Sequence, residues 1–341
     1  MSKKDNGYTI KFLILIAAFL AAIIISVVLG RYAVSVDDFF KILWSRLPFT
    51  DPDQTWEPVT EKVLLEIRLP RVAAALLIGA SLSMAGVCYQ GMFRNPLVSP
   101  DILGASTGAG FGAALAILLG AGYFLISSMA FLFGISAVLL AYAVSRFSKT
   151  NETLAMILSG MVISSLFSAG TSFIKLVADT DDQLPAITYW LMGQLSSIKV
   201  PDVKFIIIPM AIGMIPLIFI RWRLNLLTIE EETSKSVGVN ITLLRLIVVI
   251  CATLLTAAAV SVSGMIGWIG LIIPHLCRMI YGYDYRRLIP ATALFGATFL
   301  LVVDDVARMA TTAEIPIGIL TSFLGAPLFL YLLITGGGMK K

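Results

Sequence analysis

Charged residues are scarce in this sequence. Asp, Glu, Lys and Arg make up 13% of its 341 residues, where a soluble domain carries about 25%, and 58% of the residues are hydrophobic. So few charges cannot cover the surface of a water-soluble protein of this size. The composition therefore excludes an ordinary soluble fold and indicates a protein that lies largely in a membrane.

Residues that hold metals, haem or nucleotides are also few. His275 is the single histidine, and Cys88, Cys251 and Cys277 show no paired spacing, so a metal cluster, a disulfide framework and His-ligated haem are not predicted. The sequence has no Gly-x-x-x-x-Gly-Lys-Ser/Thr loop for binding ATP. We expect no catalytic residue, metal, cofactor or nucleic-acid partner for this chain itself, and any nucleotide energy must come from a partner subunit.

Apolar runs of membrane-spanning length are what the sequence has instead. A transmembrane helix needs roughly 20 mostly apolar residues. Such runs lie near residues 10–30, 69–90, 101–120, 122–145, 153–177, 203–221, 241–263, 266–282, 288–306 and 315–335. The prediction is an all-α integral membrane protein, one domain over residues 1–341, with about ten transmembrane helices.

Charge placement predicts the orientation. With the N-terminus placed inside, fifteen of the 25 Lys and Arg residues fall on the inner segments. Because Lys and Arg accumulate on the cytoplasmic side, both termini are predicted to be cytoplasmic. Two outer segments are long: residues 31–67, with an interfacial helix expected over Val36 to Leu47, and residues 178–202, with a short surface or re-entrant helix expected over Ala186 to Leu195.

Small residues are concentrated in two of the predicted spans. Residues 79–86 read Gly-Ala-Ser-Leu-Ser-Met-Ala-Gly, and residues 257–264 are similarly small. The two spans are five apart in the order, so they would cross the membrane in opposite directions, as in an inverted repeat. Close helix packing alone also favours small residues, and both interpretations stay open.

Polar residues near the helix ends are the candidate functional residues. Arg68 and Arg71 flank Pro70 at an outer helix start, where they either anchor the helix by snorkelling or bind an acidic partner. An inner turn holds Asn95, Pro96, Pro100, Asp101 and Gly104, in which Asp101 is expected to cap a helix start.

Three further segments carry polar residues. Residues 226–240 form the longest predicted inner segment, which is either a solvated charged face or a contact for a motor subunit. Pro274 is expected to kink its span and free a backbone carbonyl, and His275 is interpreted as a buried hydrogen-bonding residue rather than a ligand. Asp304 and Asp305 precede Arg308 by four and three residues, so an intrahelical ion pair is predicted.

These segments together resemble the permease subunit of the binding-protein-dependent ABC importers for iron-siderophores, haem and cobalamin, the FecCD-type family. The resemblance runs from about Arg68 to Leu333. Its motifs are Arg-Leu-Pro-Arg at 68–71, Gln-Gly at 90–91, Arg-Asn-Pro-Leu at 94–97, Pro-Asp-Ile-Leu-Gly at 100–104, Tyr-Trp-Leu-Met-Gly at 189–193, Gly-Leu-Ile-Ile-Pro-His at 270–275, Glu-Ile-Pro-Ile-Gly at 314–318 and Gly-Ala-Pro at 325–327.

The resemblance implies a fold, partners and residue roles. It implies the type II permease fold of ABC importers and a pair of permeases, identical or paralogous, with two cytoplasmic ATPases that hold ATP and Mg, and an external binding protein. By position, Arg68, Arg71 and Arg308 match docking residues for the binding protein, and Thr153 matches a residue of the inner gate. The segment Glu230, Glu231, Glu232, Thr233, Ser234, Lys235, Ser236, Val237, Gly238 and Val239 matches the coupling helices. Motif residues Glu314 and Pro316 match structural positions.

Two departures from the family accompany the match. Glu230 stands where the family commonly has Gly, and Thr233-Ser234 stand where it has small apolar residues, which implies a specific cognate ATPase. Asp305 adds a second acid beside Asp304, the family's aspartate, which is expected to retune Arg308.

The functional hypothesis is import of a metal chelate, with iron-siderophore favoured because it is the family's commonest task, across a prokaryotic cytoplasmic membrane. An ion-coupled secondary carrier, with Asp304 and Asp305 as relay residues, is the rival, and a membrane scaffold is a third hypothesis.

Overall fold

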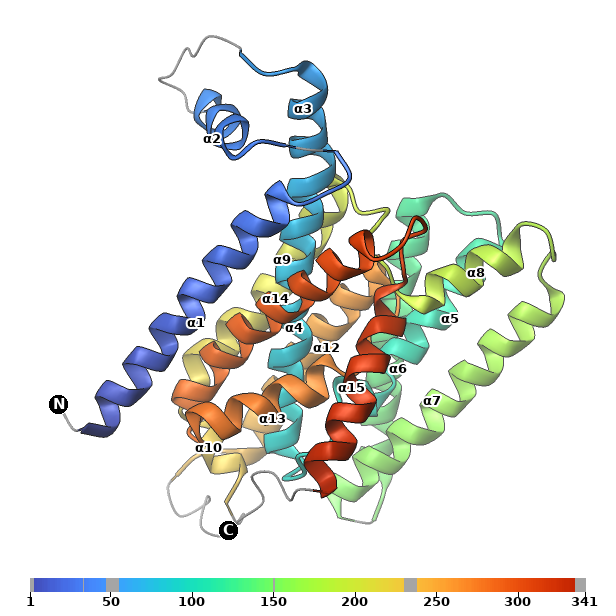
Figure 1. Ribbon diagram of the computed structural model, residues 1–341. Coiled ribbons are helices and arrows are strands. Elements are labelled where there is room, and N and C mark those ends of the chain that lie inside the picture. Colours follow the sequence, from blue (N-terminus) through green and yellow to red (C-terminus); the bar gives the residue numbers. More distant parts are fainter. Residues whose placement is uncertain (1–2, 33, 47–54, 150, 230–237, 335–341) are drawn as a thin grey trace.

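All regular structure in the described part of the chain is helical. The computed structural model describes residues 3–32, 34–46, 55–149, 151–229 and 238–334. Each of the ten predicted spans corresponds to one helix (Figure 1). These are α1 (Lys3–Val28), α4 (Leu69–Met92), α5 (Ala105–Leu118), α6 (Tyr123–Phe147), α7 (Glu152–Val177), α9 (Val200–Ile220), α12 (Ile241–Ser263), α13 (Ile269–Tyr281), α14 (Tyr285–Met309) and α15 (Ile317–Ile334).

Length separates the ten helices into two groups. Among the described residues, seven helices are long and apolar enough to cross a membrane, and α5, α13 and the apolar part of α15 are shorter. At about 1.5 Å per residue, α5 with 14 residues and α13 with 13 are each about 20 Å long, which is shorter than the roughly 30 Å hydrocarbon core of a bilayer.

Short helices cover the ends of the bundle. The predicted interfacial helix is α2 (Val36–Ser45), and the predicted surface helix is α8 (Gln183–Met192). The helices α3 (Pro58–Lys62) and η1 (Val63–Arg68, a π-helical segment) extend α4 upward, and η2 (Pro100–Leu103) and α10 (Leu224–Leu227) are single turns. We call the end with α2 and α3 the upper end and the end with α10 the lower end, as in Figure 1.

The apolar side chains of α2 point in two directions. Phe39 and Ile42 are the residues buried against the bundle. The side chains of Phe40 and Trp44 are 55% and 61% exposed. The helix therefore has apolar side chains on two faces, one toward the protein and one outward.

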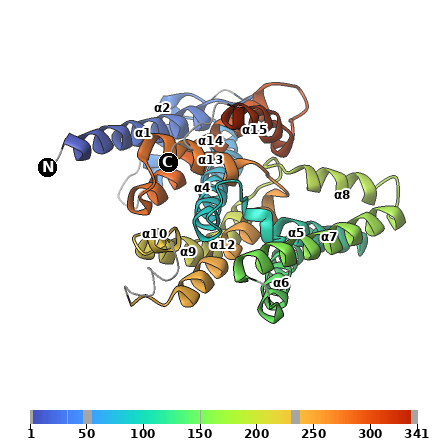
Figure 2. The same ribbon diagram turned by 90° about the horizontal axis from the view of Figure 1, so that it is seen from below.

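The centre of the bundle is formed by α4 and α12. In the most apolar window of each helix, 78% of the α4 residues and 67% of the α12 residues are buried, against 22% for α1 and α7. Seen from below, α4 lies near the middle of the bundle with α12 beside it (Figure 2). Their small side chains make this position available, because helices can approach closely only where side chains are small.

Two glycine pairs show how close this approach is. A Cβ on Gly86 of α4 would overlap the carbonyl oxygen of Gly270 in α13, and a Cβ on Gly79 would overlap that of Gly296 in α14. The small residues predicted to serve close packing do so here. The order of lengths from α4 to α6 (24, 14 and 25 residues) recurs from α12 to α14 (23, 13 and 25), which supports the predicted inverted repeat.

Candidate functional site

A buried ion-pair cluster joins the upper ends of α4 and α14. Arg71 donates from Nε and Nη2 to both carboxylate oxygens of Asp304, at 2.8–3.0 Å. Its other contact is Glu314, which precedes α15, at 2.9 Å from Nη2. The Asp304 side chain is fully buried and that of Arg71 is 8% exposed, so the Asp304 charge is compensated by its ion pair with Arg71.

The other two predicted docking arginines, Arg68 and Arg308, hold α1 in place. Arg68 donates from Nη1 to the carbonyl oxygens of Val27 and Val28, at 2.5 and 2.9 Å, and from Nη2 to that of Tyr32. Arg308 donates to the carbonyl oxygen of Ser26 at 2.5 Å. Because the last carbonyls of a helix have no partner within it, Arg68 satisfies the C-terminal end of α1.

The ion pairs within α14 are only partly as predicted. Arg308 pairs with Asp305, three residues earlier, and the hydroxyl of Ser26 also donates to Asp305 at 2.7 Å. Asp304 pairs instead with Arg71 of α4. The side chains of Asp304 and Asp305 leave the helix in different directions, so only one of them can reach Arg308.

A main-chain junction connects three helix ends beside this cluster. The amide of Gln194 donates to the carbonyl oxygen of Ser263 at 2.7 Å, and the amide of Ile317 donates to that of Gly193 at 2.8 Å. The backbone between α12 and α13 is non-helical and Trp268 has φ +70°. Gly193 has φ +74°, and a Cβ on it would overlap the carbonyl oxygen of Met265. The junction therefore depends on a glycine.

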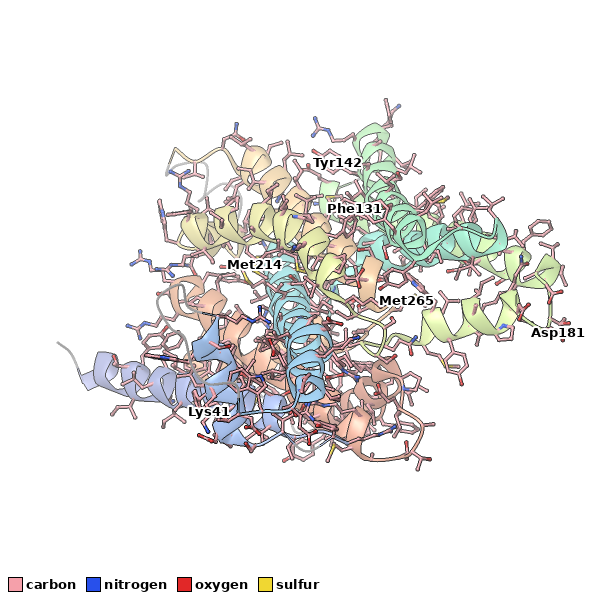
Figure 3. All side chains as sticks on the ribbon, turned by 90° about the horizontal axis from the view of Figure 1, so that it is seen from above. Lys41, Phe131, Tyr142, Asp181, Met214 and Met265 are labelled. Atoms are coloured by element: carbon pink, nitrogen blue, oxygen red, sulfur yellow. The ribbon has the colours of Figure 1, made fainter. Side chains whose placement is uncertain are left out.

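An apolar cavity of about 710 Å³ lies at this junction. Leu191 and Met192 come from α8, Met265 from the break before α13, and Ser322 and Phe323 from α15. The described lining residues are Leu191, Met192, Met265, Gly267, Gly318, Ile319, Ser322, Phe323, Ala326 and Pro327. Viewed from above, Met265 lies well inside the molecule, whereas Asp181 marks the tip beyond α8 (Figure 3). Ser322 has the one polar side chain among these described residues, so they offer little to a charged solute.

The side chain of Gln90 lies beside the backbone carbonyl that Pro274 leaves without a donor. Pro274 does not break α13, which continues to Tyr281, but its ring nitrogen cannot donate to Gly270 four residues earlier. The Gln90 amide nitrogen lies 3.5 Å from the oxygen of Gly270 and 3.2 Å from that of Leu271. Arg278 donates to the Gln90 side-chain oxygen. The sequence predicted the freed carbonyl but not the residue that fills it.

The predicted inner turn is present and its polar residues act locally. Asn95 accepts from the amide of Leu97 at 2.9 Å, Pro100 is buried at the start of η2, and Gly104 has φ +89°. Asp101 lies in the first turn of η2, at a helix start as expected, but its carboxylate accepts from the hydroxyl of Ser106 and no side chain caps η2 or α5. Pro96 lies in the same turn.

At the lower end, Thr153 lies in the first turn of α7, where its amide donates to the Asn151 side chain at 3.0 Å. Its neighbour Glu152 binds Arg245 of α12 at 2.8 Å, a link that sequence reasoning missed. Of the predicted coupling segment, residues 230–237 lie outside the described residues. Gly238 and Val239 are described, and Gly238 has φ +76°.

The remaining candidate residues have structural surroundings. Cys88, Cys251 and Cys277 are buried free thiols. His275 is half-buried in α13, and Pro316 precedes the first residue of α15. Among the described residues no group of three or more His, Cys, Asp or Glu side chains is placed to hold a metal ion.

Ten helices and an apolar cavity at the junction of α8, α13 and α15 define a multi-span membrane protein of the permease type. The FecCD transport family model matches residues 17–335, and the chain belongs to this family of ABC importer permeases.

Proteins similar to this chain are named after several different substrates. The chain is 41% identical over 320 residues to the molybdate import system permease protein MolB of Haemophilus influenzae, covering 93% of this chain and 94% of that protein. It is 44% identical over 279 residues to a protein of Helicobacter pylori named "Probable iron chelatin transport system permease protein", covering 81% and 84%.

Solved structures agree on the fold. A structure described as an inward-facing conformation of a metal-chelate type ABC transporter is 40% identical, with a TM-score of 0.84 over 94% of this chain and 97% of that chain. PsaBC from Streptococcus pneumoniae is similar in fold alone, with a TM-score of 0.57 at 19% identity. The type II permease fold implied by the resemblance is therefore confirmed.

Proposed function

We propose that this permease carries a metal chelate, with an iron-siderophore as the first candidate, into the cytoplasm. The main support for this proposal is the cavity of about 710 Å³ at the junction of α8, α13 and α15. Its walls are apolar apart from Ser322, which suits a bulky ligand that shields its metal inside an organic shell. A bare cation would lose its hydration there without compensating ligands.

Molybdate is the second candidate. The relative with a molybdate name matches nearly the whole chain, whereas the iron chelatin relative matches 81% of it. A small dianion would have to pass the same apolar walls with much of its hydration shell retained. The two candidates therefore differ in how the cavity would be used.

The proposed assembly has two permeases, two cytoplasmic ATPases with ATP and Mg, and an external binding protein. The chain would lie in the prokaryotic cytoplasmic membrane with its lower end, and both termini, toward the cytoplasm. Lys and Arg placement supports this orientation through the positive-inside rule. In the proposed cycle, ATPase closure moves the coupling segment Glu230 to Val239, and Thr153 lies at the inner gate.

The binding protein is proposed to dock at the upper end, over Arg68, Arg71 and Arg308. These side chains already have partners within the chain, and they are only 4–7% exposed. A carboxylate from the binding protein would therefore have to compete with an acid of this chain at Arg71 and Arg308, and with backbone carbonyls at Arg68. A carboxylate of the binding protein could most easily replace Glu314 as the partner of Arg71, because the Glu314 side chain is 33% exposed.

The test is transport by the reconstituted complex. The permease, its ATPase and its binding protein are placed in proteoliposomes, and uptake of radiolabelled iron-siderophore, haem, cobalamin and molybdate is measured with and without ATP. We expect ATP-dependent uptake of the siderophore. ATP-dependent uptake of molybdate alone would establish the second candidate.

Two other outcomes would overturn the mechanism itself. Uptake driven by a proton or sodium gradient without ATP would identify an ion-coupled carrier. The absence of uptake of any solute by a complex that hydrolyses ATP would support a scaffold.

A further inference from the structure

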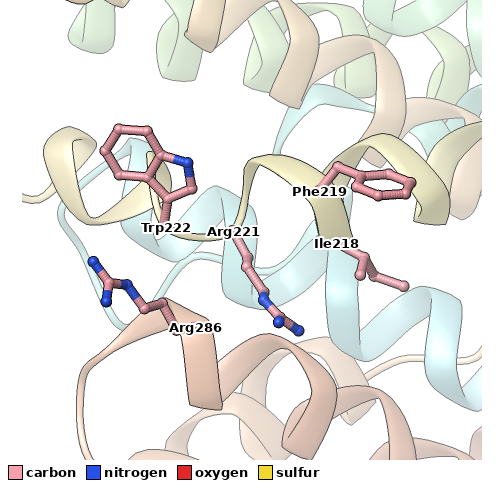
Figure 4. A pocket seen from close by; sticks show the side chains of 5 residues that line it. All are labelled: Ile218, Phe219, Arg221, Trp222 and Arg286. Carbon is pink, nitrogen blue, oxygen red and sulfur yellow. The ribbon is translucent and has the colours of Figure 1, made fainter.

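A second cavity, of about 510 Å³, lies at the lower end of the bundle. It opens where the last turn of α9 approaches the first turn of α14. Ile218 and Phe219 of α9 line one part of it, and Arg221, Trp222 and Arg286 line the rest (Figure 4). The lining therefore combines apolar side chains with two positive charges.

The two charges in this cavity have no counter-ion in the described chain. None of the described residues that line the cavity is acidic, and no ion pair joins Arg221 or Arg286 to a described carboxylate. The nearest acid in sequence, Asp284, accepts from the Asn225 side chain and from the Arg286 amide, both at 3.0 Å. By contrast, Arg71 and Arg245 each form an ion pair with an acidic residue of the described chain.

Neighbouring arginines are engaged differently. The guanidinium of Arg287 lies 4.8 Å from the centre of the Tyr8 ring, and that of Arg223 lies 5.4 Å from the centre of the Trp222 ring. Both are cation–π distances. Arg221 and Arg286 are thus the two cations of this surface that face a common cavity.

The apolar part of the lining faces the membrane. Phe219 is 78% exposed and Ile218 is 40% exposed, at the end of a helix long enough to span a bilayer. Trp222, which follows, is 43% exposed. Tryptophan is enriched where acyl chains meet headgroups, so the cavity lies at the depth of the phosphate groups.

We propose that this cavity binds the headgroup of an anionic phospholipid. Arg221 and Arg286 supply the positive charge that attracts the phosphate, and a single guanidinium can bind two phosphate oxygens at once. Ile218 and Phe219 pack against the acyl chains. Arginines that only snorkel reach water separately, whereas these two line one cavity, and basic pockets between helices are a known form of lipid site.

Native mass spectrometry of the full-length permease in detergent tests this site. Phosphatidylglycerol, phosphatidylcholine and inorganic phosphate are titrated separately. R221Q/R286Q should weaken the first phosphatidylglycerol adduct by about thirtyfold, the factor expected for two basic residues near an anionic lipid surface. R221K/R286K keeps both charges and should retain most of the binding.

The matched control is R146Q/K149Q, which removes two exposed charges at the same end but beside α6 and α7. It should leave the first adduct unchanged. Three outcomes would overturn the lipid proposal: equal weakening in the control, equal binding of phosphatidylcholine, or saturation of the cavity by inorganic phosphate.

Thermal melting of each variant verifies that it is folded. If R221Q/R286Q binds lipid normally but no longer associates with the ATPase, the cavity is an ATPase contact instead.

Discussion

Arg71 and Asp304 are 233 positions apart in the chain and form a buried, doubly hydrogen-bonded ion pair between α4 and α14. The sequence suggested either an anchor or a docking residue for Arg71, and an intrahelical partner for Asp304. The pair instead fixes two of the most buried helices of the bundle to each other. Any test of docking must therefore separate lost partner binding from lost folding.

The first prediction concerns the stability of this pair. Replacing Arg71 by Leu should cost about 3–5 kcal/mol, because Asp304 is then a buried charge with no compensation. Asp304→Asn should cost less, since Glu314 still compensates Arg71. Thermal unfolding in detergent is the measurement, and Arg31→Ala, which removes one exposed contact to Thr311, is the control. A melting temperature of Arg71→Leu equal to that of the control would contradict the assignment.

The second prediction links Gln90 to Pro274. Gln90→Leu should destabilise the protein by about 1–3 kcal/mol, because the carbonyls of Gly270 and Leu271 and the Arg278 side chain lose a buried partner. Pro274→Ala restores an amide that can bond to Gly270. The cost of Gln90→Leu should therefore be smaller in the Pro274→Ala background. Additive effects in this double-mutant cycle would show that the two residues act independently.

The third prediction tests the close approach of α4 to α13. Gly86→Ala places a Cβ on the carbonyl oxygen of Gly270, and the helices must separate. Overpacking of this kind costs about 1–3 kcal/mol or more. Gly7→Ala in α1, where nothing lies within 4 Å of the new Cβ, is the matched helical control. Loss of monodisperse protein on size-exclusion chromatography for Gly86→Ala alone is the expected result.

The fourth prediction tests the apolar cavity as the substrate path. Ser322→Trp fills the cavity from α15 and should abolish most ATP-dependent uptake in proteoliposomes. Leu324→Trp lies on the same helix, 52% exposed and outside the lining, and should transport normally. Both variants should still assemble with the ATPase. Equal uptake by the two variants would place the path elsewhere.

The sequence by itself determined the helices. A run of about twenty apolar residues must form a helix in a bilayer, because every backbone polar group has to be satisfied within the segment. All ten spans, the interfacial helix α2 and the surface helix α8 could therefore be predicted. The carbonyl freed by Pro274 could also be predicted, because the missing N–H is a property of that one residue.

Only the tertiary structure decided which polar residues meet. Arg71 reaches Asp304, Gln90 reaches α13 and Glu152 reaches Arg245, and each pair lies far apart in the chain. The cavity between α8 and α15 and the shared cavity of Arg221 and Arg286 also arise from segments that the fold brings together. Hydrophobic length is a local property of the chain, whereas side-chain pairing depends on how the helices pack.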